Sequence, residues 1–446
     1  MPELKRELNG FDLTMIAIGS TIGAGIFLTP DSVARALPSA PWILLVWLVG
    51  GLAMIAGALT FSELGAMMPR AGGVYVYLTE AYGGLVGFLY GWAYFLVVNT
   101  GGIAGICVGF ATYFGQFMNL GPVELKMVAI AGLALLTVIN VLGVKAGGVF
   151  SDVFTMLKLV GIIGLIIVGL GWGSSHVTDF SAALPPVPGG TGSAFAVALI
   201  GVVFSYGGWQ HATFVGAEAK NPKRTLPFAM IFGEGAVIVI YLLANVAYLF
   251  LLTPAQIAAS PRVAADAMAI VLGPPGAALI SLVIFISTFG TAGIYTLTAP
   301  RIYYAMARDG AFFRKVAEVH PTYQTPAFAI LFQSVWVVVL ILFWGTFESL
   351  ISYVVFTDGI FFALAATTIF IFRARRPEAA RPYRTLGYPI TPIVFIGLEI
   401  WFILKILVQR PAQAWAGLIL LALGVPVYYY WKRTVRPGPQ AIETEG

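Results

Sequence analysis

The chain has 446 residues, of which 59% are hydrophobic and only 10% are charged, and its formal net charge is +5. Soluble domains have about 45–50% apolar and about 25% charged residues, so this composition excludes a soluble enzyme, a disordered chain and a disulfide-rich scaffold. It predicts an all-α protein that crosses a membrane several times. An excess of lysine and arginine over acidic residues is typical of the cytoplasmic loops of membrane proteins, so we expect a lipid bilayer as partner and no nucleic acid.

Twelve apolar runs predict twelve transmembrane helices, because a span takes about 20 residues. The runs are approximately 12–36, 41–67, 84–114, 126–144, 150–172, 193–216, 226–252, 270–305, 327–345, 348–373, 388–408 and 413–431. Prolines fall where these helices should begin or end: Pro41, Pro69, Pro122, Pro185, Pro222, Pro326 and Pro411. If both termini are cytoplasmic, most of the 25 lysines and arginines fall in the segments on the cytoplasmic side of the membrane. This distribution predicts a plasma (inner) membrane protein with cytoplasmic tails at 1–11 and 432–446.

The first run contains three glycines within seven residues, from Gly19 to Gly25. One explanation is close helix packing, since Gly19 and Gly23 are four residues apart. The other is an unwound segment, because each glycine weakens a helix by about 1 kcal/mol relative to alanine. Unwinding at mid-membrane would expose N–H groups near Gly23, where a second half-helix would begin, and carbonyls near Thr21. Such a site fits the carboxylate and ammonium groups of an amino acid.

Lys158 lies inside the fifth run, where a lysine costs about 2.5–3.5 kcal/mol. One explanation is that its long side chain reaches the inner membrane surface near Ser151 and Asp152. The other is a buried cation beside the unwound part of the first run, which could also carry a transported proton.

The sixth run carries a second interruption, Ser205–Trp209, five runs after the first. Five is an odd number, so the second copy would be inverted in the membrane. Matching broken helices in two inverted halves indicate the binding site of a secondary transporter. We therefore expect inverted repeats at 12–172 and 193–373, with two additional helices in 388–431. Carbonyls around Phe204 and Gly207 would contribute to the site.

The remaining ionisable residues in the runs are less specific. Glu234 and Asp358 have no partner evident in the sequence, and pairing with a neighbouring helix is an alternative to a transport role. His211 follows the second interruption and could contact the substrate or its path. No Cys/His cluster has the spacing of a metal site and no phosphate-binding loop is present, so we expect no metal, no cofactor and no use of ATP.

Four motifs resemble those of the amino acid–polyamine–organocation transporters, most closely the L-type amino acid transporters and their bacterial relatives. The motifs are Ile18–Phe27, Ser62–Tyr75, Glu218–Pro227 and Arg301–Gly310. The resemblance covers nearly the whole chain and favours unwinding over packing for the glycine run. It implies a leucine-transporter-type fold of five-plus-five inverted repeats, with helices 1 and 6 unwound at mid-membrane.

The resemblance also implies the residues of the site. The backbone amides of Gly23, Ala24 and Gly25 would bind the substrate carboxylate. The backbone carbonyls of Thr21, Phe204 and Gly207 would bind its amine. The ring of Phe204 would act as a gate over the ligand. Lys158 matches the lysine that occupies the sodium position of sodium-coupled relatives, so no sodium dependence is expected.

Several residues depart from the L-type pattern. Gly207 stands where the L-type pattern usually has an aspartate, which suggests room for a substrate side chain. Ala24 stands where the glycine run usually has a serine. Gln210 replaces the acidic residue of arginine- and polyamine-handling relatives, which argues against a cationic substrate. Heavy-chain subunits attach through an extracellular cysteine near runs 3 and 4. The one cysteine here is Cys107, inside an apolar stretch, so we expect no disulfide-linked heavy-chain subunit.

These features predict a sodium-independent secondary transporter of neutral L-amino acids, not an enzyme, that exchanges its substrates by alternating access. The alternatives are proton-coupled uptake through Lys158, transport of cationic amino acids or polyamines, and a sensor that binds an amino acid without moving it. The short tails count against a sensor. A membrane-embedded enzyme would need a catalytic constellation, which the sequence does not contain.

Overall fold

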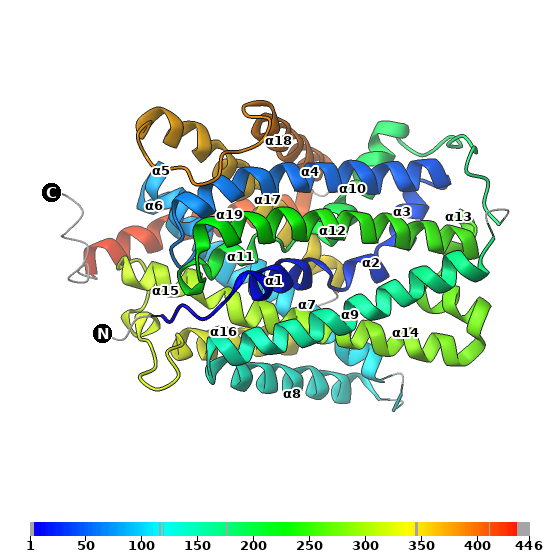
Figure 1. Ribbon diagram of the computed structural model, residues 1–446, viewed down its shortest axis with the longest axis horizontal. Coiled ribbons are helices and arrows are strands. Elements are labelled where there is room, and N and C mark those ends of the chain that lie inside the picture. Colours follow the sequence, from blue (N-terminus) through cyan, green and yellow to red (C-terminus); the bar gives the residue numbers. More distant parts are fainter. Residues whose placement is uncertain are drawn as a thin grey trace.

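The computed structural model describes residues 4–115, 117–118, 120–174, 177–343, 347–409 and 411–434, with only the backbone at 347–355, 409, 413 and 434. This part of the chain is all helical and contains no strand, apart from an isolated parallel bridge between Leu8 and Ala219. Most long helices run along the long axis of the molecule (Figure 1). The chain that leads into α1 and the end of α19 lie toward the same end of the molecule, at the left of Figure 1.

The helices follow the predicted apolar runs. The α-helices are α1 (Gly10–Thr21), α2 (Gly25–Leu28), α3 (Pro30–Ala36), α4 (Ala40–Met67), α5 (Val74–Tyr82), α6 (Gly84–Ala93), α7 (Asn99–Gly115), α8 (Pro122–Val141), α9 (Val144–Trp172), α10 (Thr191–Tyr206), α11 (His211–Phe214), α12 (Pro222–Leu251), α13 (Pro254–Ala259), α14 (Val263–Thr298), α15 (Pro300–Arg308), α16 (Ala327–Phe343), α17 (Phe347–Arg375), α18 (Ile390–Gln409) and α19 (Pro411–Thr434). A π-helical turn, Tyr94–Val98, joins α6 to α7, and 3-10 turns cover Gly216–Glu218 and Arg314–Ala317.

The described residues include ten helical segments that are long and apolar enough to cross a membrane. Two more apolar helices, α10 and α16, are shorter than a full span. The prediction of an all-α protein with many membrane-length helices is therefore confirmed. The number of twelve crossings stays a prediction.

Helix ends are marked by caps and prolines. Asn9 Oδ1 accepts hydrogen bonds from the N–H groups of Phe11 and Asp12 at 2.7 and 3.2 Å, and Asp12 Oδ2 accepts from the Asn9 N–H at 2.7 Å. This reciprocal capping box starts α1. The predicted placement of prolines is confirmed in the first turns of four helices, at Pro41, Pro122, Pro222 and Pro411. A proline in the first turn lacks only an N–H that has no helical partner.

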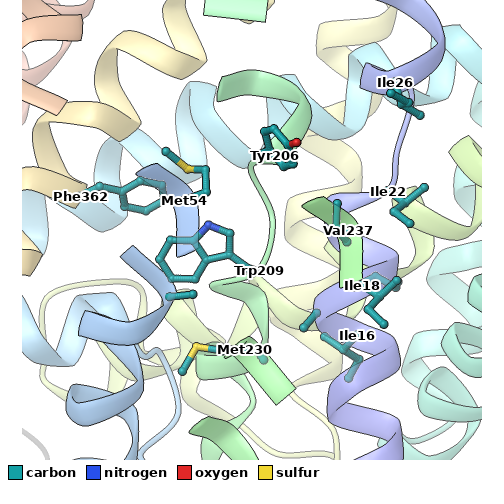
Figure 2. Packing of buried hydrophobic residues seen from close by; sticks show 14 of the residues in the cluster. Ile16, Ile18, Ile22, Ile26, Met54, Tyr206, Trp209, Met230, Val237 and Phe362 are labelled. Atoms are coloured by element: carbon teal, nitrogen blue, oxygen red, sulfur yellow. The ribbon is translucent and has the colours of Figure 1, made fainter. Parts of the chain in front are cut away.

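The packing places α1 in the middle of the bundle. Helix α12 packs against α4, α1 and α9, and α14 packs against α9 and α7. Figure 2 shows the core where α1 gives way to α2, with Ile22 beside the chain that links them. Trp209 is fully buried in the link between α10 and α11, and its ring centroid lies 5.1 Å from that of Phe61 and 6.1 Å from that of Phe362. The hydrophobic core therefore anchors both places where a helix is interrupted.

Candidate site between two interrupted helices

The first apolar run is interrupted in its middle. Helix α1 ends at Thr21, residues 22–24 are not helical, and α2 begins at Gly25, two residues beyond the start predicted near Gly23. The later start has a local cause, because the Gly23 N–H donates to the Thr21 carbonyl at 2.8 Å and closes a tight turn. The N–H groups of Ala24 and Gly25 have no acceptor among the described residues. Two of the three predicted amides are thus available to a ligand, and the third is used within the turn.

The sixth run is interrupted at 207–210, between α10 and α11. Gly208 has a φ of +136°, and a Cβ there would lie 2.4 Å from the carbonyl oxygen of Ser20. Ser20 Oγ lies 2.8 Å from the Gly208 carbonyl and 2.5 Å from the Ile16 carbonyl of its own helix, so its one proton is shared between the two. On the other side of the contact, a Cβ at Gly25 would lie 2.6 Å from Ser205 Cα. The two interrupted segments therefore touch backbone to backbone, which only glycine permits at these positions.

Tyr241 of α12 connects the two interruptions. Its hydroxyl lies 3.0 Å from the Thr21 carbonyl and 3.1 Å from the Ser205 carbonyl. One hydroxyl has one proton, so it donates to these carbonyls in alternation or as a shared bond. The ring is fully buried, 5.5 Å from Trp47 between centroids. Sequence reasoning missed Tyr241, since a tyrosine in an apolar span carries no specific signal.

Lys158 of α9 is fully buried and binds the end of α1. Its Nζ donates to the carbonyls of Gly19 and Ile22 at 2.9 and 2.8 Å and to Thr291 Oγ1 at 2.8 Å. Ser287, also on α14, adds a weaker contact of 3.3 Å from its Oγ to the Ile22 carbonyl. Three acceptors match the three donors of an ammonium group. The alternative that Lys158 reaches the membrane surface is therefore wrong.

A cavity of about 90 Å³ opens between the two interruptions. Its lining includes all six residues expected to hold the substrate: Thr21, Gly23, Ala24, Gly25, Phe204 and Gly207. Lys158 is not among the described residues that line it, and it reaches the lining through its hydrogen bonds to the carbonyls of Gly19 and Ile22 and to Thr291, which does line the cavity. The structure thus brings the six residues together and places Lys158 one layer outside them.

The last residue of the second interruption, Gln210, and the residue that follows it, His211, also line the cavity. Gln210 Oε1 accepts from the Gly208 N–H at 3.0 Å. His211 is fully buried, with Nδ1 2.5 Å from Thr298 Oγ1 and Nε2 3.3 Å from the Tyr94 hydroxyl. Both side chains therefore have partners within the protein.

The acidic residues of the spans divide into two groups. Asp358 of α17 and Glu399 of α18 line the cavity, whereas Glu234 of α12 is fully buried outside its lining. Sequence reasoning missed Glu399, although a single acidic residue within the apolar run 388–408 was a usable signal. In the described part of the chain, no three His, Cys, Asp or Glu side chains form a set that could hold a metal ion.

Two of the four family-like motifs meet in a buried ion pair. Arg301 Nε and Nη2 donate to the two carboxylate oxygens of Glu218 at 2.7 and 2.8 Å, and both side chains are fully buried. Arg301 also donates to the carbonyl of Leu297 one turn earlier in the chain. The pair joins α15 to the turn that follows α11, so these motif residues have a structural role close to the second interruption.

Comparison with known proteins agrees with this arrangement. Residues 8–428 match the amino acid permease family. The serine/threonine exchanger SteT of Bacillus subtilis (strain 168) is 32% identical over 433 residues, which is 96% of this chain and 98% of that protein. The human b(0,+)-type amino acid transporter 1 is 29% identical over 437 residues, 96% of this chain and 88% of its own. The human large neutral amino acids transporter small subunit 2 is 31% identical over 440 residues, 96% and 81% of the two chains.

These relatives are transporters and not enzymes. The match extends over nearly all of the apolar helices, so the chain is a multi-pass membrane protein. Together, the match, the two interrupted helices and the cavity between them show that the chain belongs to the amino acid permease family.

Proposed function

We propose that the protein is a sodium-independent secondary transporter of neutral L-amino acids that exchanges one amino acid for another by alternating access. The observation that carries the proposal is the cavity between the interruptions. It offers free N–H groups of Ala24 and Gly25 to a carboxylate and the carbonyls of Thr21, Phe204 and Gly207 to an amine. Donors and acceptors in one small cavity fit a zwitterion. A carbonyl oxygen accepts two hydrogen bonds, and the Thr21 carbonyl, which accepts from the Gly23 N–H, has its second place open when the Tyr241 hydroxyl donates to Ser205. Phe204 would also act as the gate.

The proposed architecture has twelve membrane crossings in two inverted repeats, 12–172 and 193–373, followed by two helices in 388–431. The reciprocal contacts of Gly25 with Ser205 and of Gly208 with Ser20 support it, since each interrupted helix meets the other in the same way. The tails at 1–11 and 432–446 would be cytoplasmic in a plasma (inner) membrane. The chain leading into α1 and the end of α19 lie toward the same end of the molecule, which supports placing both tails on one side of the membrane.

Lys158 supports the proposed sodium independence and exchange. Its ammonium group donates hydrogen bonds to the carbonyls of Gly19 and Ile22 and to the hydroxyl of Thr291. These are oxygens of the kind that would otherwise coordinate a metal cation such as sodium. An ammonium group with all three donors used favours a fixed charge over a proton that leaves in each cycle, which favours exchange over proton coupling through Lys158. SteT, one of the relatives, is named as an exchanger, and we extend that mode to this chain.

The proposed transporter works without a disulfide-linked heavy-chain subunit. Cys107 is the one cysteine of the chain, and its side chain is fully buried. A buried thiol cannot reach a partner chain to form a disulfide.

Transport assays in proteoliposomes test the function. Uptake of radiolabelled L-serine by the purified protein should require an internal amino acid and should be unchanged when sodium is replaced by potassium. If an imposed proton gradient drives uptake into vesicles without internal amino acid, the protein is a proton-coupled transporter and the exchange proposal is wrong. Binding of amino acids without flux of any of the proteinogenic set would indicate a sensor and overturn the transport proposal.

A further inference from the structure

One face of α12 carries an arginine followed by two phenylalanines. Arg224, Phe228 and Phe232 are spaced four residues apart, so they lie in one line along the helix, which we call the α12 stripe. All three side chains are exposed, and the two rings stack with their centroids 5.3 Å apart and an angle of 6° between their planes. Helix α12 is among the membrane-length helices, so these rings offer a flat apolar surface to lipid chains.

Arg224, at the start of the stripe, has no anionic partner in the described part of the chain. Several other arginines pair with carboxylates, among them Arg70, Arg301 and Arg373. Arg224 is exposed, and its guanidinium group forms no ion pair and no hydrogen bond with any described residue. A guanidinium group presents parallel N–H donors that match the oxygens of a phosphate. The stripe therefore combines a phosphate-binding group with an apolar surface one helical turn away.

The chain that leads into α1 adds positive charge beside the stripe. The Lys220 N–H donates to the Leu8 carbonyl at 2.7 Å, so the residues before α1 run beside the segment that leads into α12. Lys220 and Arg6 are exposed, and neither pairs with a carboxylate of the described residues. Lys5 is offset by Glu7, at 3.6 Å between Nζ and Oε1. Basic residues beside a bilayer surface attract anionic lipids, and each one adds to the attraction.

We propose that the α12 stripe, with Arg6 and Lys220 beside it, binds an anionic phospholipid. The phosphate group contacts Arg224, and an acyl chain lies on the rings of Phe228 and Phe232. Charge and rings follow each other along α12 in the order in which a phospholipid presents its phosphate and its chains to a helix that enters the bilayer. A soluble anion would use Arg224 but would gain nothing from the stacked rings. The inference goes beyond the proposed function and does not depend on it, since it needs only that α12 crosses a membrane.

Lys223 offers a matched comparison in the same helical turn. It is basic and exposed like Arg224, but the residues that follow it along its own line of the helix, Pro227 and Met230, are buried. A diffuse attraction between positive charge and anionic lipids would weaken by the same amount when either residue is neutralised. A lipid seated on the stripe depends on Arg224 and not on Lys223.

Native mass spectrometry of the detergent-purified, full-length protein tests the site. The protein is incubated with equal amounts of phosphatidylglycerol and phosphatidylcholine that carry the same acyl chains, and the ratio of the two lipids retained is measured. We expect the unaltered protein to prefer phosphatidylglycerol, and Arg224→Gln to lower that preference about fivefold. Lys223→Gln should leave the preference unchanged. No preference in the unaltered protein, no loss in Arg224→Gln, or equal losses in the two variants would overturn the proposal.

Two further measurements separate a lipid from a soluble phosphate. Glycerol 3-phosphate has the phosphate group without the chains, so it should not displace bound phosphatidylglycerol. Displacement by glycerol 3-phosphate would overturn the lipid as ligand in favour of a soluble anion. The double variant Phe228→Ala and Phe232→Ala should retain several-fold less phosphatidylglycerol, whereas Phe343→Ala, at an exposed phenylalanine of α16, should retain as much as the unaltered protein. Equal retention by the double variant and Phe343→Ala would overturn the seating of a lipid chain on the stripe.

Discussion

At the first interruption the freed carbonyls of Gly19 and Ile22 are bound by a side chain from another helix, Lys158, together with Thr291. At the second interruption the chain supplies its own partner, since Gln210 Oε1 accepts from the N–H of Gly208 two residues earlier. Both arrangements give hydrogen-bond partners to backbone groups that the interrupted helix leaves unpaired, because an unpaired backbone group is costly away from water.

The difference has a consequence for how each interruption can be damaged. The first depends on polar side chains that are distant in sequence, and the second depends on local backbone geometry and on close contact with α1. Polar substitutions should therefore act mainly at the first interruption, and steric substitutions mainly at the second.

Lys158→Met should have the largest effect. It keeps most of the apolar stem but removes the donor shared by two carbonyls and a hydroxyl. Thr291 Oγ1 can donate to only one of the two carbonyls at a time, and each buried acceptor left without a donor costs about 1–3 kcal/mol. We expect a marked fall in the thermal stability of the detergent-purified protein and a loss of serine exchange. Lys223→Met, at an exposed position in the first turn of α12, is the control. Unchanged stability and exchange in Lys158→Met would contradict the view that the ammonium group holds the first interruption.

Gly208→Ala should rank second and act through sterics. The new Cβ would meet the Ser20 carbonyl at 2.4 Å on a backbone with a φ of +136°. Strain and overlap of this kind together cost about 2–3 kcal/mol. Thermal unfolding checks the result against Gly235→Ala, a helical site with nothing within 4 Å of the added carbon. Equal melting temperatures for the two variants would show that the backbone contact is not tight.

Tyr241→Phe should have a smaller effect that is shared by both interruptions. It removes one hydroxyl while keeping the ring in place, and a hydrogen bond of this kind contributes about 1 kcal/mol. Exchange should slow several-fold with a modest loss of thermal stability. Tyr90→Phe is a suitable control, since the Tyr90 hydroxyl is buried with no hydrogen-bond partner in the described part of the chain, and its removal should be neutral or stabilising. A larger effect for Tyr90 than for Tyr241 would count against the bridging role.

Ser287→Ala should have the smallest effect. Its contacts with the carbonyls of Ile22 and Gly23 are long, at 3.3 and 3.2 Å, and the Ile22 carbonyl keeps Lys158 and Thr291. We expect a change within about 0.5 kcal/mol in thermal stability. A loss as large as that of Lys158→Met would mean that the hydroxyls, and not the ammonium group, hold the first interruption.

Much of the site could be predicted from local sequence. Helix propensity made an interruption at the glycine run one of two explanations, and the resemblance to a known family favoured it over close helix packing; α1 then ends at Thr21, where the first half-helix was expected to end. The start of α2 could not be placed to the residue, because the turn that joins Thr21 to Gly23 competes with the helix for the same N–H. Glu399 shows a different limit, since an acidic residue in an apolar run gives no sign of which helix or cavity it faces.

Composition and the length of the hydrophobic runs alone determined that this is a membrane protein of many helices. The free energy of placing a segment in the bilayer is a sum over its consecutive residues, so it can be read from the sequence. Tertiary structure alone decided whether Lys158 faces the surface or the end of α1, since its partner Thr291 is 133 residues away in the chain. It also decided that Asp358 and Glu399 share one cavity wall. Helical periodicity specifies which residues share a face, but the depth of a side chain and its partners depend on how the helices pack.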